Sequence, residues 1–269
     1  MGKLTIGKIP YANLFPIYYT LQNKCDCSGY EFIEGVPSKL NRMLRDGEID
    51  ISPSSSIEFI RNPHLYNLID GHSISCSGCI ASILLFSRKP VNELNGGKIY
   101  VTSQSETSIA LLNIVLKKFY GIECDLIASD KPENSDGDAF FLIGDDALKL
   151  NKELQDGKES LLVYDLGEIW AEHTNLPFVF ALWIARKEVY QDKLKKQLLD
   201  RFIKDLDNAK YSFKQNIYTI GQLASFRGIL SEEEMVLYWN KINYDLTKEH
   251  KTALELFRKY LMEMSYLPH

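Results

Sequence analysis

The clearest indication of the fold class is the stretch EFIEGVPSKLNRMLRDGEIDISPSS, residues 31–55. EFIEGV reads as an extended segment, and Pro37 then opens a helix in which Leu40 and Leu44 recur at helical spacing. Gly47 ends this helix, and IDIS follows as a second short strand. Strand, helix and strand in this order predict an α/β sheet with ligand loops at the strand ends.

The same alternation continues further along the chain. KIYVT, residues 98–102, predicts a strand, SQSETS a polar turn, and IALLNIVLKKFYG a helix that ends at Gly121. DAFFLIGDDAL, residues 138–148, and LLVYDLGEIW repeat the order of strand and polar turn. Long helical patterns dominate from Lys187 onward.

These patterns predict two α/β lobes joined by two crossings of the chain. The first lobe is expected to comprise residues 1–85 and 180–269, and the second residues 86–179. A ligand cleft is expected between the lobes. Residues 188–269 are expected to be scaffold, and LYWNKINYDL, residues 237–246, has the aromatic density of a packing or subunit surface.

Composition excludes several classes of function. The 269 residues are 45% hydrophobic, which suits one large or two modest domains. With 31 basic and 36 acidic residues the formal charge is −5, and no basic stripe suggests a nucleic-acid partner. No apolar run reaches the roughly eighteen residues of a membrane span, and no export signal is visible, so a cytoplasmic protein is expected.

Neither a metal nor an organic cofactor is indicated. Free thiols are the default for the five cysteines, and the alternative is a zinc site that joins Cys25 and Cys27 with Cys76 and Cys79. The histidines lack the spacing of a zinc helix, and no glycine-rich phosphate loop is present.

Hydroxyl-rich turns are the candidate binding elements. Residues 102–108, TSQSETS, lie between a strand and a helix N-terminus, where free backbone amides favour an anion. SPSSS, residues 52–56, is a second such cluster, and two of them suggest a ligand with two acidic groups. The plainer interpretations are that Ser105 is only an N-cap and that Asp145 caps the next helix.

Six stretches together resemble a known family, the chorismate dehydratases of the futalosine route to menaquinone. The resemblance spans residues 4 to about 187 and is specific as an ordered set. The stretches are IGKIPYANLFPIYY, VPSKLNRMLRDGEIDISPSSSIEF, GCIASILLFSRKP, TSQSETSIALL, LIGDDAL and YDLGEIWAEHTNLPFVFALWIARK.

The resemblance implies the two-lobed α/β fold of type II periplasmic binding proteins. It also implies a hydro-lyase that removes water from chorismate, a dicarboxylate, to give 3-[(1-carboxyvinyl)oxy]benzoate without metal or cofactor. Two hydroxyl-rich turns would suit the two carboxylates.

The family's activity-linked asparagine and serine match Asn13 and Ser82. An amide both donates and accepts hydrogen bonds, and a hydroxyl does either, so the pair could orient a carboxylate or the departing hydroxyl. The alternatives are a turn residue before Pro16 for Asn13, and a strand hydroxyl bonded to a carbonyl for Ser82.

Six further residues are expected to contact the substrate. Phe178 could shield the ring from water, although a core aromatic is the commoner role for such a residue. The six residues are Ser55, Thr107, Ser108, Gly144, Asp145 and Phe178.

Two departures from the family pattern and two rival functions stay open. Cys79 replaces a usual proline before the serine, and Glu106 stands in the serine-rich turn. The sister cyclic dehypoxanthinyl futalosine lyase shares the fold but opens with a different motif and uses a histidine near the IGDDAL turn. A non-catalytic small-acid-binding protein is the other rival, and either a monomer or a homodimer is expected.

Overall fold

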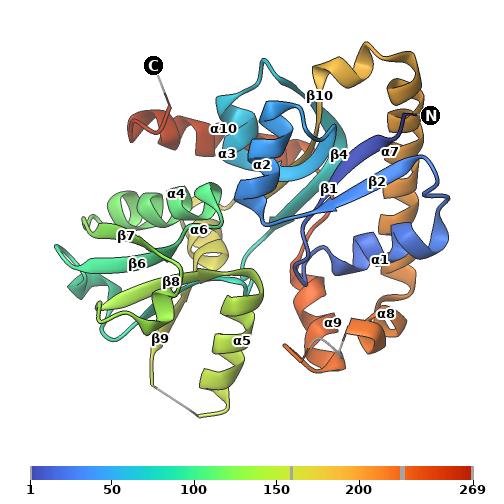
Figure 1. Cartoon of the computed structure of the whole chain (residues 1–269). Helices are drawn as coiled ribbons and strands as arrows, with labels where there is room; N and C mark the ends of the chain where they lie inside the picture. The colour runs from blue at the N-terminus through green and yellow to red at the C-terminus, as the bar shows by residue number, and fades with distance from the viewer. Residues whose placement is uncertain (1, 158–159, 225–227, 268–269) are drawn as a thin grey trace. The chain divides into compact units, whose positions relative to one another are not determined.

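Two five-stranded sheets, each in its own compact unit, organise the chain (Figure 1). This computed structural model describes residues 2–157, 160–224 and 228–267. The strand orders are β2-β1-β3-β10-β4 and β7-β6-β8-β5-β9, so non-consecutive strands lie side by side in both sheets. The predicted α/β class with two lobes is confirmed.

The contacts divide the chain at other places than the sequence pattern suggested. The first unit contains the chain up to Ile74, Ala181–Val236 and Tyr244–Leu246, and the rest forms the second unit. The expected boundary at residue 85 therefore falls at residue 75, and the last helix joins the second unit instead of the first. A helical pattern shows that a helix has an apolar face but not which sheet that face covers.

The first unit contains parallel strands β1, β2 and β3, with β10 antiparallel to β3. Its strands are β1 (Leu4–Lys8), β2 (Tyr30–Glu34), β3 (Ile51–Ser55), β4 (Tyr66–Cys76) as far as Ile74, and β10 (Phe178–Arg186) from Ala181 onward. Its helices are α1 (Phe15–Lys24), α2 (Pro37–Asp46), α3 (Ser56–Arg61), α7 (Lys193–Gln215), α8 (Ile217–Ala224) and the start of α9 (Glu232–Lys241).

The opening stretch folds as its pattern predicts. Pro37 is the first residue of α2, where its missing N–H is not needed. Gly47 ends α2 with φ +81°, a left-handed conformation that glycine adopts at low cost. Aromatic packing then holds α7 on the sheet, because Phe202 contacts Tyr30 and Trp183 with ring centroids 5.4 and 5.6 Å apart.

The second unit contains parallel β6 and β8, with β5 antiparallel to β8. Its strands are β5 (Ile83–Ser87), β6 (Lys98–Thr102), β7 (Asp125–Ser129), β8 (Ala139–Ile143) and β9 (Leu162–Asp165). Its helices are α4 (Glu106–Ile114), continued by a π-helical turn (Val115–Phe119), α5 (Gly144–Gln155), α6 (Leu166–Thr174) and α10 (Lys248–Glu263).

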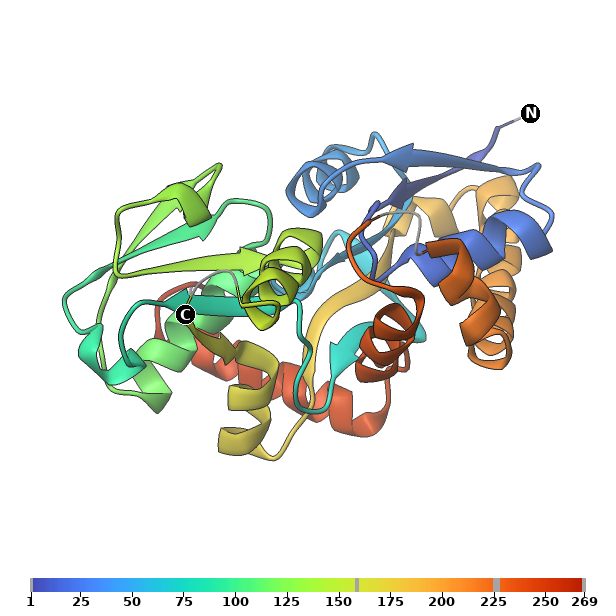
Figure 2. The same cartoon turned by 90° about the horizontal axis from the view of Figure 1, so that it is seen from below.

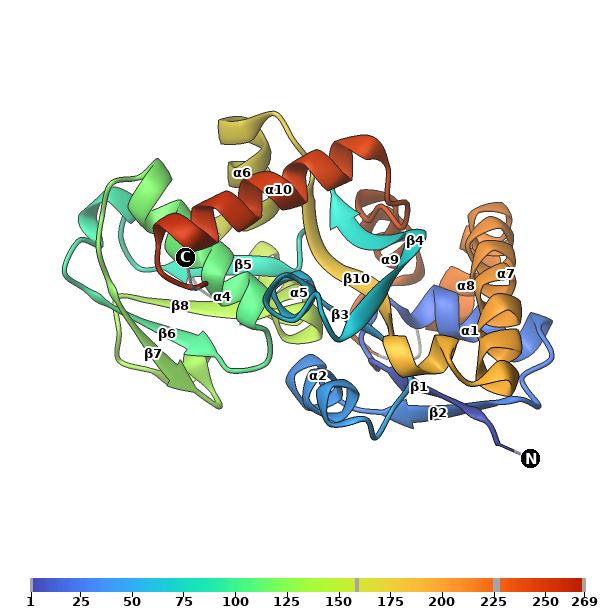
Figure 3. The same ribbon diagram turned by 90° about the horizontal axis from the view of Figure 1, so that it is seen from above.

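Two apolar clusters hold the second unit together. Leu84, Phe86, Phe140 and Leu142 pack against Ala147 of α5. In the other cluster α10 lies beside α6 (Figures 2 and 3), and its residues contact Trp170 through aromatic rings. This second cluster is what ties the C-terminal helix to the second unit.

Candidate active site

In the first unit, Asn13 and Ser55 follow neighbouring strands. β1 and β3 are parallel with Ile6 opposite Ile51, so their carboxyl ends lie at one edge of the sheet. Asn13 lies in the turn between β1 and α1, and Ser55 is the last residue of β3. Carboxyl ends of parallel strands are where α/β proteins bind ligands, so the fold places both predicted residues at a suitable edge.

Asn13 carries a buried acceptor without a partner. Its Oδ1 has no hydrogen-bond partner among the described residues, as is also true of Ser54 Oγ and Asn41 Oδ1. Leaving such an atom unpaired costs about 1–3 kcal/mol, so native proteins usually supply a partner or a ligand. Asn13 Oδ1 is thus a buried acceptor that a ligand or a water could satisfy.

Ser55 is held by α2. Asn41 Nδ2 donates to Ser55 Oγ at 2.9 Å, and both residues are more than nine-tenths buried. A serine oxygen that accepts a hydrogen bond keeps its own hydrogen for another acceptor. Ser55 is therefore arranged to donate.

In the second unit, five predicted residues gather at one sheet edge. β6 and β8 are parallel, and β5 begins where β8 ends, with Ile83 opposite Ile143. Ser82 precedes β5, and the Gly144 amide donates to the Ser82 carbonyl at 2.7 Å. Thr107, Ser108 and Asp145 belong to the first turns of the helices that follow β6 and β8.

The loop before Ser82 is strained and organised by Asp165. Ala81 has φ +64°, a left-handed conformation that is costly for a residue with a side chain. Asp165 Oδ2 accepts the amides of Ile80 and Ala81 at 3.0 and 2.6 Å, while Oδ1 accepts the amides of Gly167 and Glu168. One carboxylate thus caps α6 and stabilises the serine loop.

Cys79, the departure from the family pattern, belongs to the same network. Its thiol donates to Asp165 Oδ2 at 3.1 Å, and Lys241 Nζ lies 3.5 Å from the sulfur. Burial, with Asp165 second, raises the pKa of Cys79 to about 11, so the residue is a neutral thiol at physiological pH.

The Ser82 hydroxyl has a partner that is remote in sequence. Tyr238 of α9 donates its phenolic hydrogen to Ser82 Oγ at 3.0 Å, and each residue is only 3% exposed. The alternative interpretation, in which the Ser82 hydroxyl bonds a strand carbonyl, is therefore not supported.

The α4 turn has the expected cap. Ser105 is the N-cap and accepts the Ser108 amide at 3.3 Å. Its hydroxyl also lies 3.1 Å from Ser108 Oγ. Thr107 is fully buried and Ser108 is 2% exposed, so both hydroxyls face the protein interior near the helix N-terminus.

The capping role predicted for Asp145 is wrong. β8 runs directly into α5, so the N-cap is Ile143 and no side chain caps the helix. Gly144 allows this because it takes φ +61°, which a residue with a side chain rarely adopts. Asp145 lies in the first turn of α5 and is half-buried.

Phe178 lies in the aromatic core. It is 1% exposed, and its ring is 5.0 Å from Trp170, 4.8 Å from Phe180 and 5.1 Å from Phe257. These contacts account for its position, and they match the commoner role of such a residue instead of the proposed shielding of a substrate.

No metal site is visible in the described part of the chain. Within it, no three histidine, cysteine or carboxylate side chains lie close enough to hold an ion. All five cysteines are free.

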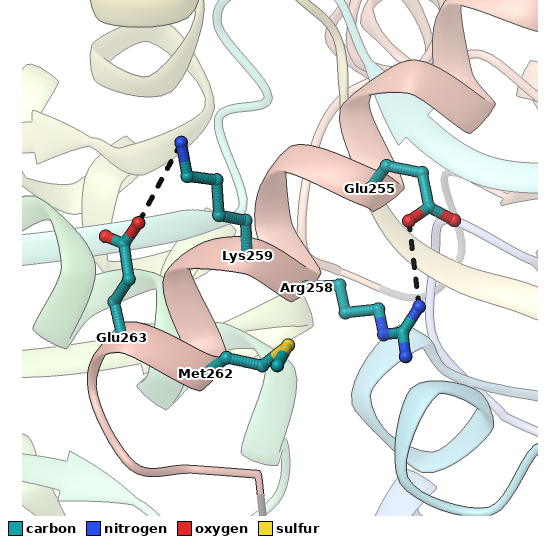
Figure 4. Close-up of a pocket in the computed structure, with 5 residues that line it drawn as sticks. All are labelled: Glu255, Arg258, Lys259, Met262 and Glu263. Carbon is teal, nitrogen blue, oxygen red and sulfur yellow. Dashed lines mark ion pairs between the residues drawn. The ribbon is translucent and has the colours of Figure 1, made fainter. Parts of the chain in front are cut away.

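Two hollows occur within single units. One of about 100 Å³ lies beside the β1–α1 turn and is lined partly by Pro10, Tyr11 and Phe15. The other, of about 540 Å³, runs along α10 (Figure 4), where Arg258 pairs with Glu255 and Lys259 with Glu263 at 3.9 and 4.0 Å. No predicted site residue lines either hollow.

Three contributors escaped the sequence analysis. Asp165 precedes a helix with Glu168 three residues on, a pattern that signals a cap but not contact with residues 79–81. Asn41 lies on an otherwise amphipathic helix, and Tyr238 lies in a stretch whose aromatic density indicates a packing or subunit surface. Only tertiary contacts reveal what these side chains do.

Comparison with known proteins places the chain among enzymes of one pathway. The model of a family described as menaquinone biosynthesis matches residues 4–263. A chorismate dehydratase of Campylobacter jejuni is 34% identical over 262 residues, covering 95% of this chain and 96% of the relative. Another, of Thermus thermophilus, is 30% identical over 207 residues, covering 70% and 72%.

Solved structures share the fold. A protein of Archaeoglobus fulgidus has a TM-score of 0.78 at 16% identity and covers 98% of both chains. The alkanesulfonate-binding protein of Xanthomonas axonopodis, bound to MOPS, has a TM-score of 0.74 at 16% identity, covering 100% of this chain and 95% of that one. The periplasmic-binding-protein-like fold is thus established, and in the described residues no helix has the length and apolarity to cross a membrane.

Proposed function

This chain belongs to the menaquinone biosynthesis family, and on that basis we propose that it is a chorismate dehydratase. The enzyme would act as a hydro-lyase on a small dicarboxylate and release 3-[(1-carboxyvinyl)oxy]benzoate and water. Its main support is the 34% identity to a chorismate dehydratase over 95% of the chain.

The structural observation that supports the proposal most is the buried, unpartnered Oδ1 of Asn13. A substrate hydroxyl or a substrate-bound water could donate to this atom, while the amide nitrogen donates to a carboxylate. Ser82 would complete the acting pair as a hydrogen-bond donor.

The elimination breaks two bonds between ring carbons and their substituents, one C–H bond and one C–O bond. The hydrogen on the ether-bearing carbon leaves as a proton, its electron pair forms the last ring double bond, and the neighbouring hydroxyl departs. Water is formed from that hydroxyl and one proton, and aromatisation supplies the driving force.

The proton acceptor is proposed to be the substrate's own enolpyruvyl carboxylate. Asp165 contacts the loop before Ser82, but its carboxylate already accepts hydrogen bonds from four backbone amides and from one thiol. Positioning by Asn13 and Ser82 would then replace a protein base, since orientation alone can lower a barrier by about 7–11 kcal/mol at its upper limit.

The carboxylates would be bound at helix N-termini and serine hydroxyls. In the second unit Thr107 and Ser108 lie in the first turn of α4, and Gly144 and Asp145 begin α5, whose N-cap residue makes no side-chain hydrogen bond. In the first unit Ser55 is set to donate. Backbone amides at a helix start favour negative charge, which suits a dianion.

A cytoplasmic location is also proposed. All five cysteines are free, and two of them, Cys76 and Cys79, occur in the chain segment next to Ser82. Free thiols persist best in a reducing compartment.

The first test is incubation of the protein with chorismate, followed by ultraviolet spectroscopy and mass analysis. We expect a product lighter by one water, and an Asn13→Ala variant slowed by about 100-fold or more, as for loss of a group that orients the reacting atoms. Asn23→Ala is the matched control, because Asn23 is an exposed residue of α1 whose side chain, within the described part of the chain, bonds only the Tyr19 carbonyl. Unchanged chorismate would contradict the proposal and favour a binding protein, or the sister lyase if cyclic dehypoxanthinyl futalosine is consumed.

A further inference from the structure

We propose that the stretch Tyr238–Tyr244 positions both residues that act on the substrate, with Tyr238 directing the Ser82 hydroxyl and Tyr244 holding Asn13. The inference rests on the proposed function and adds two positioning residues to it. Its basis is two hydrogen bonds, one in each unit, both supplied by the sequence YWNKINY.

Tyr238 determines what the Ser82 hydroxyl can do. A serine hydroxyl has one hydrogen to donate and two lone pairs to accept. Tyr238 donates to one lone pair at 3.0 Å, and Ser82 Oγ has no other hydrogen-bond partner among the described residues. The serine hydrogen is therefore left for a ligand oxygen, and Ser82 serves as a donor to the departing hydroxyl or a carboxylate.

Tyr238 orients Ser82 and does not supply a proton. The ring is buried, and this burial raises the pKa of Tyr238 well above its ordinary value. A transfer of its proton through Ser82 would leave a buried phenolate near the carboxylates of Asp145 and Asp165. The neutral phenol is the stable form, so its contribution is geometric.

Tyr244 acts on the backbone of Asn13. Its hydroxyl donates to the Asn13 carbonyl at 2.5 Å, and its ring packs edge-on against Phe213 at 5.8 Å. Because the ring is 4% exposed, its hydroxyl is held in place. This hydrogen bond fixes the backbone of Asn13, from which its side chain extends.

The stretch is itself anchored along β4. Ser75 and Asn243 exchange backbone hydrogen bonds at 2.7 and 2.9 Å, and the Ser73 amide donates to the Tyr244 carbonyl at 3.0 Å. Ser75 Oγ adds a bond to the Asn243 carbonyl. The two tyrosines therefore project from hydrogen-bonded backbone.

The test is a pair of double-mutant cycles on chorismate turnover. Tyr238→Phe is expected to lower kcat about 10-fold with KM changed less than about threefold, because only the donor to Ser82 is lost. In a Ser82→Ala background the same change should have no further effect. Tyr244→Phe should likewise lower kcat in the wild type. In an Asn13→Ala background, the same change should not lower kcat any further.

The control is Tyr66→Phe, another buried tyrosine whose hydroxyl has a side-chain partner, Glu58 at 2.7 Å. It should leave kcat within about twofold, and thermal unfolding of all variants should show folded proteins. Effects of Tyr238→Phe and Ser82→Ala that multiply would overturn the inference, since a merely structural role acts independently of Ser82.

The two proposals fail in different ways. Normal wild-type turnover with an unaffected Tyr238→Phe variant refutes the positioning role alone. If the wild type binds chorismate without turnover, the proposed function fails and the same cycles are measured on Kd, where additivity again overturns the inference. Absence of both binding and turnover overturns the two together.

Discussion

A single carboxylate, Asp165, determines the conformation of the loop that presents Ser82. It accepts two amides from that loop and two from the start of α6. Hydrogen bonds to an ionised acceptor are about twice as strong as neutral ones, so they can offset the left-handed conformation of Ala81. At the residue scale, the position of Ser82 thus depends on a side chain outside the predicted site.

Asp165→Asn should destabilise the protein by about 1–3 kcal/mol and lower turnover. The amide group replaces one acceptor oxygen with a donor that faces other donors, which leaves buried N–H groups unpaired. Denaturant unfolding and chorismate turnover check this.

The matched control for this change is Asp192→Asn. Asp192 caps α7 by accepting the Leu194 and Lys195 amides through one oxygen, and asparagine caps as well as aspartate. The free energy of unfolding of the Asp192→Asn variant should differ from that of the wild type by less than about 0.5 kcal/mol. Equal losses in the two variants would show that Asp165 is no more than a cap.

At the scale of elements, β4 and α7 meet through a buried histidine. His72 of β4 is 4% exposed, and its Nε2 lies 3.3 Å from Asp207 of α7. Burial, with the nearby charge of Lys210 second, lowers the pKa of His72 to about 4, against the opposing effects of Asp207, Asp245 and Asp70. The histidine is therefore neutral in the folded protein at physiological pH.

Stability should decline as the pH falls from 6.5 towards 4. In that window the unfolded chain binds a proton at His72 that the folded protein does not, so the loss is about 2 kcal/mol between pH 7 and pH 5. His72→Gln should reduce this pH dependence in denaturant unfolding, whereas His64→Gln, at an exposed position, should leave it as in the wild type. An unchanged slope for His72→Gln would refute the assignment.

At the scale of the molecule, each unit has its own aromatic core. Phe257 of α10 packs against Trp170 and Phe178 in the second unit, and Phe202 of α7 packs against Tyr30 and Trp183 in the first. Both phenylalanines are 1% exposed or less. The two units therefore offer equivalent sites at which to weaken one core alone.

Phe257→Ala should destabilise the second unit, and Phe202→Ala the first, each by about 3–5 kcal/mol. Hydrogen exchange read by mass spectrometry should show faster exchange in β6 and β8 for the former, and in β1 and β3 for the latter. Equal acceleration of all four strands in both variants would mean that the units unfold as one cooperative block.

Local pattern was sufficient to predict most elements. Pro37, Gly47 and Ser105 begin, end and cap helices as expected, because these roles depend on a residue's own backbone preferences and immediate neighbours. Asp145 was mispredicted as a cap because Gly144 lets β8 pass straight into α5. For Asp145, the cap could not be placed from sequence because the end of the preceding strand was not known.

Residues of the candidate site likewise fall into two groups: those that local motifs predict and those that only tertiary contacts reveal. Short contiguous motifs are enough to predict the α/β alternation and the hydroxyl-rich turns, and the family resemblance adds Asn13 and Ser82. Tertiary contacts reveal that α10 belongs to the second unit, and that Asp165, Asn41, Tyr238 and Tyr244 hydrogen-bond to candidate site residues or to the loop before Ser82. The physical reason is that a hydrogen bond between residues 82 and 238 depends on where folding brings two side chains, and no local propensity or periodicity encodes that distance.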